Sequence, residues 1–380
     1  MTYMSASIQF LECRLSLIHI PLHLYPHFVQ AILSLILPSI SSSSGGKSAW
    51  DEDLAPGHHS TRTPSLSSEA FVNISVTPVE CSVVCSTQQV ENLFAPIIQT
   101  LSSSLREEVK ISEDEFVAIQ VDGEGLDAGQ RVLDLTSPLA LAGVPIFFLT
   151  TYFSDYILVP SGNRNNVTRA LQRRGFVFER HTEAFVTSPS HHRNSSSTPS
   201  FIIAPPSPPP TTTVGELQIK TFEKLRKQSV VPQVNKNTRL VLCAGRRSAN
   251  KGRGIDDRGL YLGLVKCLIS NPQFLSVTLT DAEPASLLLE KEMLPMFGSD
   301  DALLGSKEDV LIPILLDLRG LPVDSTGIVC GVAGKLVGGA TRGNLDRTEA
   351  IEMSYLSTAR AGTVIVAEDD LARAVAALEM

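Results

Sequence analysis

The segment whose residues most suggest chemistry is glycine-rich: Gly331-Val332-Ala333-Gly334-Lys335. It resembles a fragment of a phosphate-binding loop, in which four residues separate the glycines and a Ser or Thr follows the lysine. Backbone amides and a hydroxyl can then hold phosphate and magnesium. Here the spacing is shorter, and Leu336 follows the lysine. We therefore interpret the segment as a strand-to-helix turn in which glycine allows close approach.

The other candidate groups also favour structural roles. Paired histidines and acids do not combine into a recognisable site, and no GxSxG nucleophile motif occurs. The acids of Asp369-Asp370 are expected to open a helix, where negative charge offsets the helix dipole. The cysteines form no CxxC pair; they are Cys13, Cys81, Cys85, Cys243, Cys267 and Cys330. We expect no catalytic site, no metal site and no cofactor, and hence a protein that is not an enzyme.

Composition and charge indicate which classes of binding partner, nucleic acid or membrane, the chain can have. The chain has 380 residues and a formal net charge of −8, which argues against nucleic-acid binding, because phosphate contacts need an excess of Lys and Arg. Leu15 to Leu37 contains no charged residue and is long enough to span a bilayer. Its prolines and histidines favour a strand from Ile8 to Ile20, a turn at Pro21 to Pro26 and a helix from Phe28 to Leu37. We expect a cytoplasmic protein without membrane insertion, with a membrane-anchored form as the alternative.

Two stretches are unlike the rest of the chain. Residues 39–69 are rich in Ser, Gly, His and Pro, and residues 183–236 contain runs of Ser, Pro and Thr. Such compositions bury too little apolar surface to offset the entropy of ordering. The first is predicted to be a disordered insertion and the second a disordered linker between two halves.

The two halves resemble each other. Phe148-Leu149-Thr150-Thr151 and Ile157-Leu158-Val159 have counterparts 207 residues later. Phe71, Ile74 and Phe94 have counterparts 203 residues later. Two similar offsets on separate segments predict a duplicated half of roughly 205 residues.

A smaller unit recurs within each half. Residues 116–178 alternate between strand and helix patterns in the order βαββαβ, which is the ferredoxin-like arrangement. In the last unit we expect Gly327 to Ala333 to be the first strand, followed by a strand-strand-helix pattern. The prediction is an α/β (α+β, ferredoxin-like) fold with four modules, at residues 5–105, 106–182, 237–307 and 308–380.

Several of these segments resemble the CASTOR family of cytosolic arginine sensors, whose members contain four ACT domains. The resemblance lies in VPIFFLTTYFSDYILV at Val144 to Val159, DSTGIVCGVAG at Asp324 to Gly334, and YLST at Tyr355 to Thr358. It also includes Ile8 to Arg14 and Phe71 to Phe94. The module at 237–307 matches least.

The resemblance implies a non-catalytic regulatory protein that forms homodimers and contacts the GATOR complex upstream of TOR kinase. Arginine would bind between the second and fourth ACT domains. The implied ligand-binding residues are Pro145, Ile146, Ser325, Thr326, Gly327, Thr358, Ala359 and Gly362. The implied partner-binding residues are Tyr152, Phe153 and Asp155.

The chain departs from the family at the ligand pocket. Ser325 and Gly362 stand where the family has acids, and Pro145 replaces a residue that contributes a hydroxyl. A guanidinium in a closed pocket needs an anionic or well-bonded partner. Asp324 is one position out of register. The alternatives are a sensor of another amino acid, a ligand-independent adaptor protein, and an ACT regulatory subunit of a biosynthetic enzyme.

Overall fold

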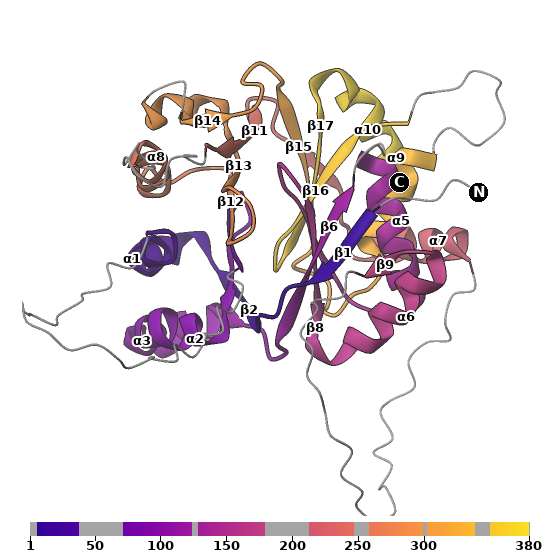
Figure 1. Ribbon diagram of the computed structural model, residues 1–380, viewed down its shortest axis with the longest axis horizontal. Helices are drawn as coiled ribbons and strands as arrows, with labels where there is room; N and C mark the ends of the chain where they lie inside the picture. The colour runs from indigo at the N-terminus through magenta and orange to yellow at the C-terminus, as the bar shows by residue number, and fades with distance from the viewer. Residues whose placement is uncertain are drawn as a thin grey trace, which may run out of the picture.

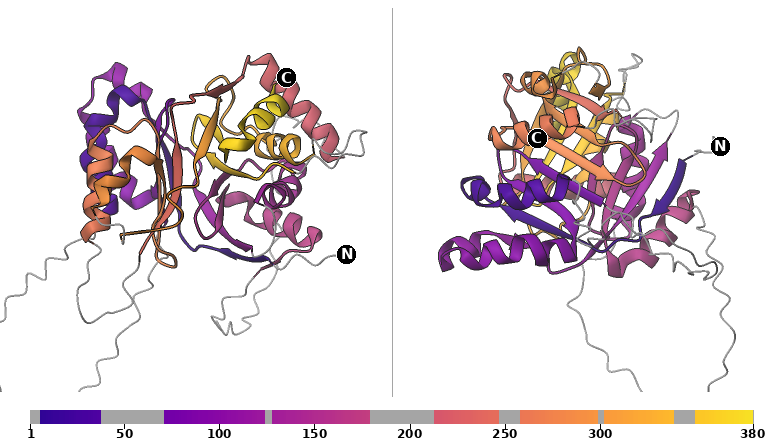
Figure 2. Two further views of the ribbon diagram at one scale, coloured as in Figure 1. Left: turned by 90° about the horizontal axis from the view of Figure 1, so that it is seen from above. Right: turned by 60° about the vertical axis from the view of Figure 1, so that its left-hand side comes forward.

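The protein is built in four layers. The computed structural model describes residues 6–37, 71–123, 128–178, 213–246, 258–298, 302–338 and 350–379. Two β-sheets face each other, and each carries helices on its outer side (Figures 1 and 2). The strand pairing closes on itself, because β6 and β15 each also pair with one strand of the second sheet.

The first sheet contains strands from both halves of the chain. In spatial order they are β9 (Val177–Phe178), β1 (Ala6–Phe10), β6 (Phe116–Gly123), β8 (Asp155–Pro160), β7 (Phe147–Thr150), β16 (Met353–Ser357), β17 (Ala361–Ala367), β15 (Leu311–Asp317) and β10 (Pro232–Val234). Its outer helices are α5 (Ala128–Leu141), α6 (Arg164–Arg174), α7 (Val214–Lys227), α9 (Ile328–Gly338) and α10 (Leu371–Leu378).

The second sheet also combines strands from both halves of the chain and carries helices on its outer side. Its order is β5 (Lys110–Ile111), β2 (Leu15–Ile20), β4 (Cys81–Ser86), β3 (Phe71–Val76), β12 (Leu275–Thr280), β13 (Ser286–Glu290), β11 (Leu240–Gly245) and β14 (Leu303–Leu304). Its helical layer includes α1 (Tyr25–Ile36), α2 (Thr87–Gln89), α3 (Ala95–Thr100), α4 (Ser103–Glu108), α8 (Arg258–Ile269) and the helical turns η2 (Val90–Phe94) and η4 (Lys291–Phe297). Short 3-10 turns at η1 (Leu22–Leu24), η3 (Ser161–Asn163) and η5 (Glu368–Asp370) precede α1, α6 and α10.

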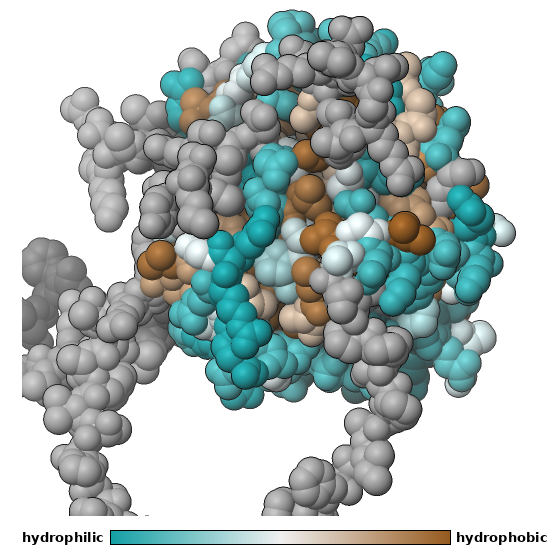
Figure 3. Space-filling view, turned by 90° about the vertical axis from the view of Figure 1, so that its right-hand side faces the viewer, coloured by the Kyte–Doolittle hydropathy of each residue, from teal (hydrophilic) through white to brown (hydrophobic). Residues whose placement is uncertain are grey.

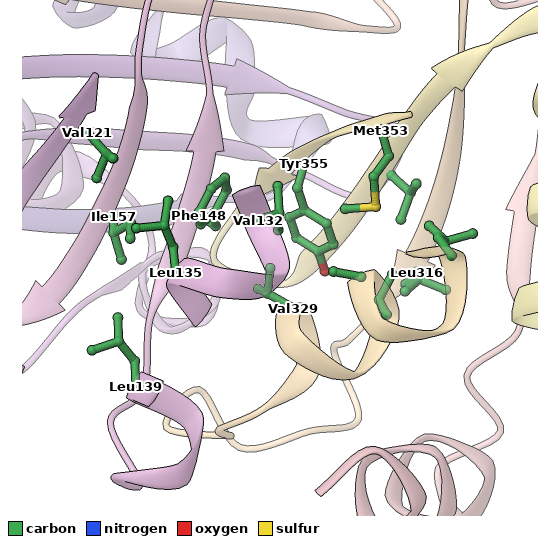
Figure 4. Packing of buried hydrophobic residues seen from close by; sticks show 14 of the residues in the cluster. Val121, Val132, Leu135, Leu139, Phe148, Ile157, Leu316, Val329, Met353 and Tyr355 are labelled. Carbon is green, nitrogen blue, oxygen red and sulfur yellow. The ribbon is translucent and has the colours of Figure 1, made fainter. Parts of the chain in front are cut away.

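Apolar side chains fill the three spaces between the layers. Because successive strand residues point to opposite faces, β8 places Tyr156 and Leu158 between the sheets and Ile157 and Val159 beneath its helices. Figure 4 shows the helix side of this packing, where Val132 of α5 and Val329 of α9 lie close to Tyr355 of β16. The outer helical face shows separate apolar patches among hydrophilic residues (Figure 3).

Equivalent residues of the two halves meet at both seams between them. In the second sheet Ile74 pairs with Val277, which is 203 residues later. In the first sheet Leu149 pairs with Leu356, which is 207 residues later. The hydrogen bonds beside Leu149 are reciprocal: the amide of Phe148 donates to Ser357 Oγ at 2.9 Å, and the amide of Tyr355 donates to Thr150 Oγ1 at 3.0 Å. The two sequence offsets thus mark a local two-fold relation.

The ferredoxin-like α/β class is confirmed, because β6, α5, β7, β8, α6 and β9 follow one another in the predicted βαββαβ order. The strand predicted over Ile8 to Ile20 is broken at residues 11–14, so β1 and β2 lie in different sheets. The following helix forms as α1. No described helix is both long and apolar enough to span a membrane. All six cysteines lie in the described residues, are buried and form no disulfide.

The prediction that Gly327 to Ala333 is a strand is wrong. This segment enters α9, and the first strand of the last unit is β15. The glycines explain the error: a Cβ on Gly331 would lie 2.7 Å from Thr221 Cγ2, and one on Gly334 would overlap Gln218. Glycine therefore lets α7 pack closely against α9, and Gly331 to Lys335 lie inside α9 and do not form the predicted strand-to-helix turn.

The prediction that residues 183–236 form a disordered linker is also wrong in its last part. Residues 214–227 form α7 and residues 232–234 form β10, whereas residues 39–69 and 183–212 lie outside the described chain. The apolar residues Leu217, Phe222 and Leu225 of α7 recur at helical spacing and are buried, together with Thr221 on the same face. The adjoining Pro and Thr run masked that pattern.

The start of α7 can be tested by removing its cap. Thr213 Oγ1 accepts a hydrogen bond from the amide of Glu216 at 3.2 Å. Thr213→Ala is expected to lower the free energy of unfolding by about 1 kcal/mol, because an N-cap acceptor is lost. Hydrogen exchange of the first turn of α7 should quicken, whereas exchange in α6 should stay unchanged. Unaltered exchange in α7 would contradict this role of Thr213.

Candidate functional site

A cavity opens where the two halves meet in the first sheet. Its walls come from α5 and from some of the residues in the segments 144–147, 318–330 and 355–362, so both halves contribute. Its volume is about 50 Å³, or about 600 Å³ when the open solvent at its mouth is included. We call it the seam cavity. It lies on the helix side of the sheet, beside β7, β16 and the beginning of α9.

Two turns shape the seam cavity. Before α9, Gly327 adopts a positive φ of 83°, which favours glycine, and a Cβ there would lie 3.0 Å from Leu217 of α7. The second turn joins β16 to β17 and is closed by Thr358, whose amide donates to the carbonyl of Ala361 at 2.9 Å. The side chain of Lys224 donates to Ser325 Oγ at 2.8 Å, so α7 supports the first turn from behind.

The lining of the seam cavity is apolar with scattered hydroxyl and thiol groups. Among the described residues that line it, none is Asp, Glu, Lys, Arg or His. Tyr355 is 1% exposed, and burial raises the pKa of its hydroxyl well above its usual range. Burial also raises the pKa of the Cys330 thiol to about 11. Both groups are therefore neutral at physiological pH and can only donate or accept hydrogen bonds.

Most of the predicted ligand-binding residues border this one cavity. They are Ile146, Ser325, Gly327, Thr358, Ala359 and Gly362. Pro145 instead lines an adjoining cleft, and Thr326 lines neither space. The offset between the two units grows from 197 residues at Leu139 and Leu336 to 207 at Leu149 and Leu356, so the last unit has about ten extra residues before Ile351; residues 339–349 lie outside the described chain.

The adjoining cleft is charged. Ala359, Phe147 and Val323 separate it from the seam cavity and line both spaces. It contains Lys110 and Arg360 as well as three acids, Glu113, Asp114 and Asp324. Asp324 is exposed and lies in the loop before α9, not on a strand as the sequence register assumed. No group of three or more His, Cys, Asp or Glu side chains that could hold a metal occurs in the described chain.

The predicted partner-binding residues do not form one exposed loop. Phe153 is 44% exposed. Its ring meets the Tyr152 ring edge-on, with 4.9 Å between the two ring centroids. Asp155 is fully buried, and its Oδ2 accepts from Arg131 Nε of α5 at 2.5 Å. The prediction that Asp155 contacts a partner is therefore wrong. At the start of β8 its side chain points beneath α5, because strand residues alternate between faces.

A buried carboxylate that sequence reasoning missed holds one wall of the seam cavity. Glu80 is fully buried in the turn between β3 and β4. Its Oε1 accepts from Thr358 Oγ1 at 2.6 Å and from the amide of Arg360 at 2.5 Å, and its Oε2 contacts His19 Nδ1 at 2.5 Å. Glu80 thereby ties the second sheet to the β16–β17 turn. No sequence motif marks it, because its partners are 61 to 280 residues away.

Comparison with known proteins assigns one part of the chain. Residues 111–173 match the sequence model of the ACT domain family, so this segment is similar to an ACT domain. It includes β6, α5, β7 and β8, which supply half of the seam. ACT domains are regulatory modules that bind amino acids. No curated protein matches the chain in sequence.

Several solved structures share a weak likeness. Protein Atu0741 from Agobacterium tumefaciens is 18% identical, with 46% of this chain and 95% of that chain covered and a TM-score of 0.26. Aspartate kinase from Synechocystis is 10% identical, with 98% of this chain and 54% of that chain covered and a TM-score of 0.32. The ligand-free regulatory subunit of aspartate kinase from Thermus thermophilus is 11% identical, with 46% and 99% covered and a TM-score of 0.29. At these TM-scores none of the three decides the function.

Proposed function

We propose that this protein is a non-catalytic regulatory protein that binds an amino acid in the seam cavity. The observation that carries the proposal is the meeting of segments 144–147, 318–330 and 355–362 around one cavity, the first of which lies within the residues that match the ACT domain. A ligand at a seam touches both halves of the chain, so its affinity depends on how they are arranged. Binding can therefore shift the population of arrangements and change a partner surface.

The finer proposal is a CASTOR-type sensor in the TOR pathway. It would be cytoplasmic and homodimeric, and a GATOR-like complex would be its partner. Tyr152 and Phe153 remain the proposed partner contacts, because Phe153 is exposed and its ring meets the Tyr152 ring edge-on. The alternatives are an ACT regulatory subunit of an amino-acid biosynthetic enzyme and a ligand-independent adaptor protein.

Calorimetric titration of the full chain with each of the twenty amino acids tests the proposal. We expect saturable binding of at least one, which Ser325→Phe should weaken tenfold or more, because the larger side chain would occupy the mouth of the cavity. Ser306→Phe is the matched control, since Ser306 is exposed and lines neither space. A folded protein that binds none of the amino acids would overturn the proposal and favour the adaptor.

A further inference from the structure

The local two-fold relation gives the seam cavity an equivalent elsewhere in the protein. The turn from Thr151 to Ser154 has the same backbone hydrogen bond as the turn from Thr358 to Ala361: in each, the threonine amide donates to the carbonyl three residues later. Asp155 follows the first turn and Gly362 follows the second. Asp155 pairs with Thr150 and Gly362 with Ser357, so the two residues occupy the same register. We call the surroundings of Asp155 the twin site.

The protein itself places a guanidinium in the twin site. Arg131 reaches from α5 to Asp155, and both side chains are largely buried, at 17% and 0% exposure. The buried residues Val132, Leu135 and Leu139 of α5 recur 197 residues later as Val329, Val332 and Leu336 of α9, and the same offset places Ile328 opposite Arg131. At the seam cavity, an isoleucine and a glycine thus stand where the twin site has an arginine and an aspartate.

This exchange explains why the seam cavity exists and what it can hold. Ile328 and Gly362 both line it, and together they fill less space than an arginine and an aspartate. A Cβ on Gly362 would overlap Tyr355 Oη, so the tyrosine hydroxyl occupies the place of an acidic side chain. A buried cation is costly without an anionic partner, and the described lining contains none.

We infer that the seam cavity selects an amino acid with an uncharged aliphatic side chain, in the class of valine, leucine and isoleucine, and not arginine. The inference rests on the proposed function and specifies its ligand. The side chain would lie among Ile146, Phe147 and Ile328, and the charged α-ammonium and α-carboxylate groups would lie near Ser325, which is partly exposed. Tyr355 and Thr358 supply neutral hydrogen-bonding groups, which do not compensate a buried guanidinium.

Calorimetric titration of the full chain with valine, leucine, isoleucine, arginine and lysine tests the inference. At least one aliphatic amino acid should bind tenfold or more tightly than arginine and lysine, and Ser325→Phe should weaken that binding while Ser306→Phe does not. Arginine binding as tight as that of every aliphatic ligand would overturn the inference and leave the proposed function standing. Binding of none of the twenty amino acids would overturn both. Aliphatic binding that Ser325→Phe leaves unchanged would also overturn the inference, because the site would lie elsewhere.

A second variant tests whether the absence of an acid at Gly362 causes the preference against arginine. Gly362→Asp combined with Tyr355→Phe restores an acid and removes the hydroxyl that would obstruct it. Gly362 has no positive φ, so aspartate meets no backbone penalty there. This double variant should gain affinity for arginine relative to leucine by tenfold or more, and Tyr355→Phe alone should not. If the folded double variant kept the unaltered preference, the missing acid would not explain the selectivity.

Discussion

Replacing Arg131 by alanine is expected to lower the free energy of unfolding by about 3–5 kcal/mol, because it leaves a buried carboxylate without its countercharge. Asp155 is fully buried, and its Oδ1 already has no hydrogen-bond partner among the described residues. Chemical denaturation followed by circular dichroism measures the change. Arg174→Ala is the control: Arg174 is 58% exposed and 3.3 Å from Asp134, so its loss should cost about 0–1 kcal/mol.

The pH dependence of this variant distinguishes a buried charge from lost packing. Burial raises the pKa of Asp155, and the guanidinium of Arg131 opposes that rise. Without Arg131 the pKa in the folded state lies further above its unfolded value, so the folded state binds more protons between the two values. Stability then falls as pH rises through that window. The deficit of Arg131→Ala relative to the unaltered protein should therefore shrink as pH is lowered.

The double variant Arg131→Met/Asp155→Leu should recover much of the lost stability, because both charges leave together and apolar groups of similar volume replace them. A deficit that is independent of pH, or a double variant no more stable than Arg131→Ala, would contradict the assigned role of the ion pair.

Replacing Glu80 by alanine is expected to lower the free energy of unfolding by about 3 kcal/mol, since a buried acceptor is removed from donors that then lose their partner. It should also weaken amino-acid binding tenfold or more, because Thr358, which lines the seam cavity, and the amide of Arg360 both donate to Glu80. Calorimetry and hydrogen exchange of residues 358–361 measure the two effects.

Glu283 offers a matched control for Glu80. It lies in the corresponding turn between β12 and β13 and accepts hydrogen bonds from Ser154, from Tyr156 Oη at 2.9 Å and from Gln120 Nε2 at 2.9 Å. Glu283→Ala should also destabilise the protein, but it should leave amino-acid affinity and exchange at 358–361 unchanged. Equal loss of affinity in both variants would show that stability, and not the wall of the cavity, governs binding.

Some of the architecture could be read from local patterns. Alternating apolar residues in β6 and β8, the amphipathic spacing of α6 and the closing glycine with φ of 102° at Gly175 all encode local structure. Sequence reasoning failed where the cause was tertiary. Gly331 and Gly334 are glycines because α7 lies against α9, and the distant packing partner was invisible in the sequence.

Some residues of the candidate site could also be predicted from the sequence, and others could not. The resemblance in sequence named residues from three separate segments, and six of the eight lie around one cavity. It also placed Asp155 on a partner surface, because a motif gives no information about the face toward which a side chain points. Arg131 and Glu80 had no signal in the sequence, since their importance comes from burial opposite residues of other elements.

By itself the sequence determined the repeat, the βαββαβ order and the set of apolar strands, because these depend on the spacing of neighbouring residues. Only the tertiary structure decided that Arg131 forms an ion pair with Asp155, and that Gly362, at the equivalent position, lies beside an open cavity. The physical reason is that the cost of burying a charge depends on what lies opposite it, and that partner is brought there by the pairing of β7 with β16 and the packing of α5 and α9 on their sheet.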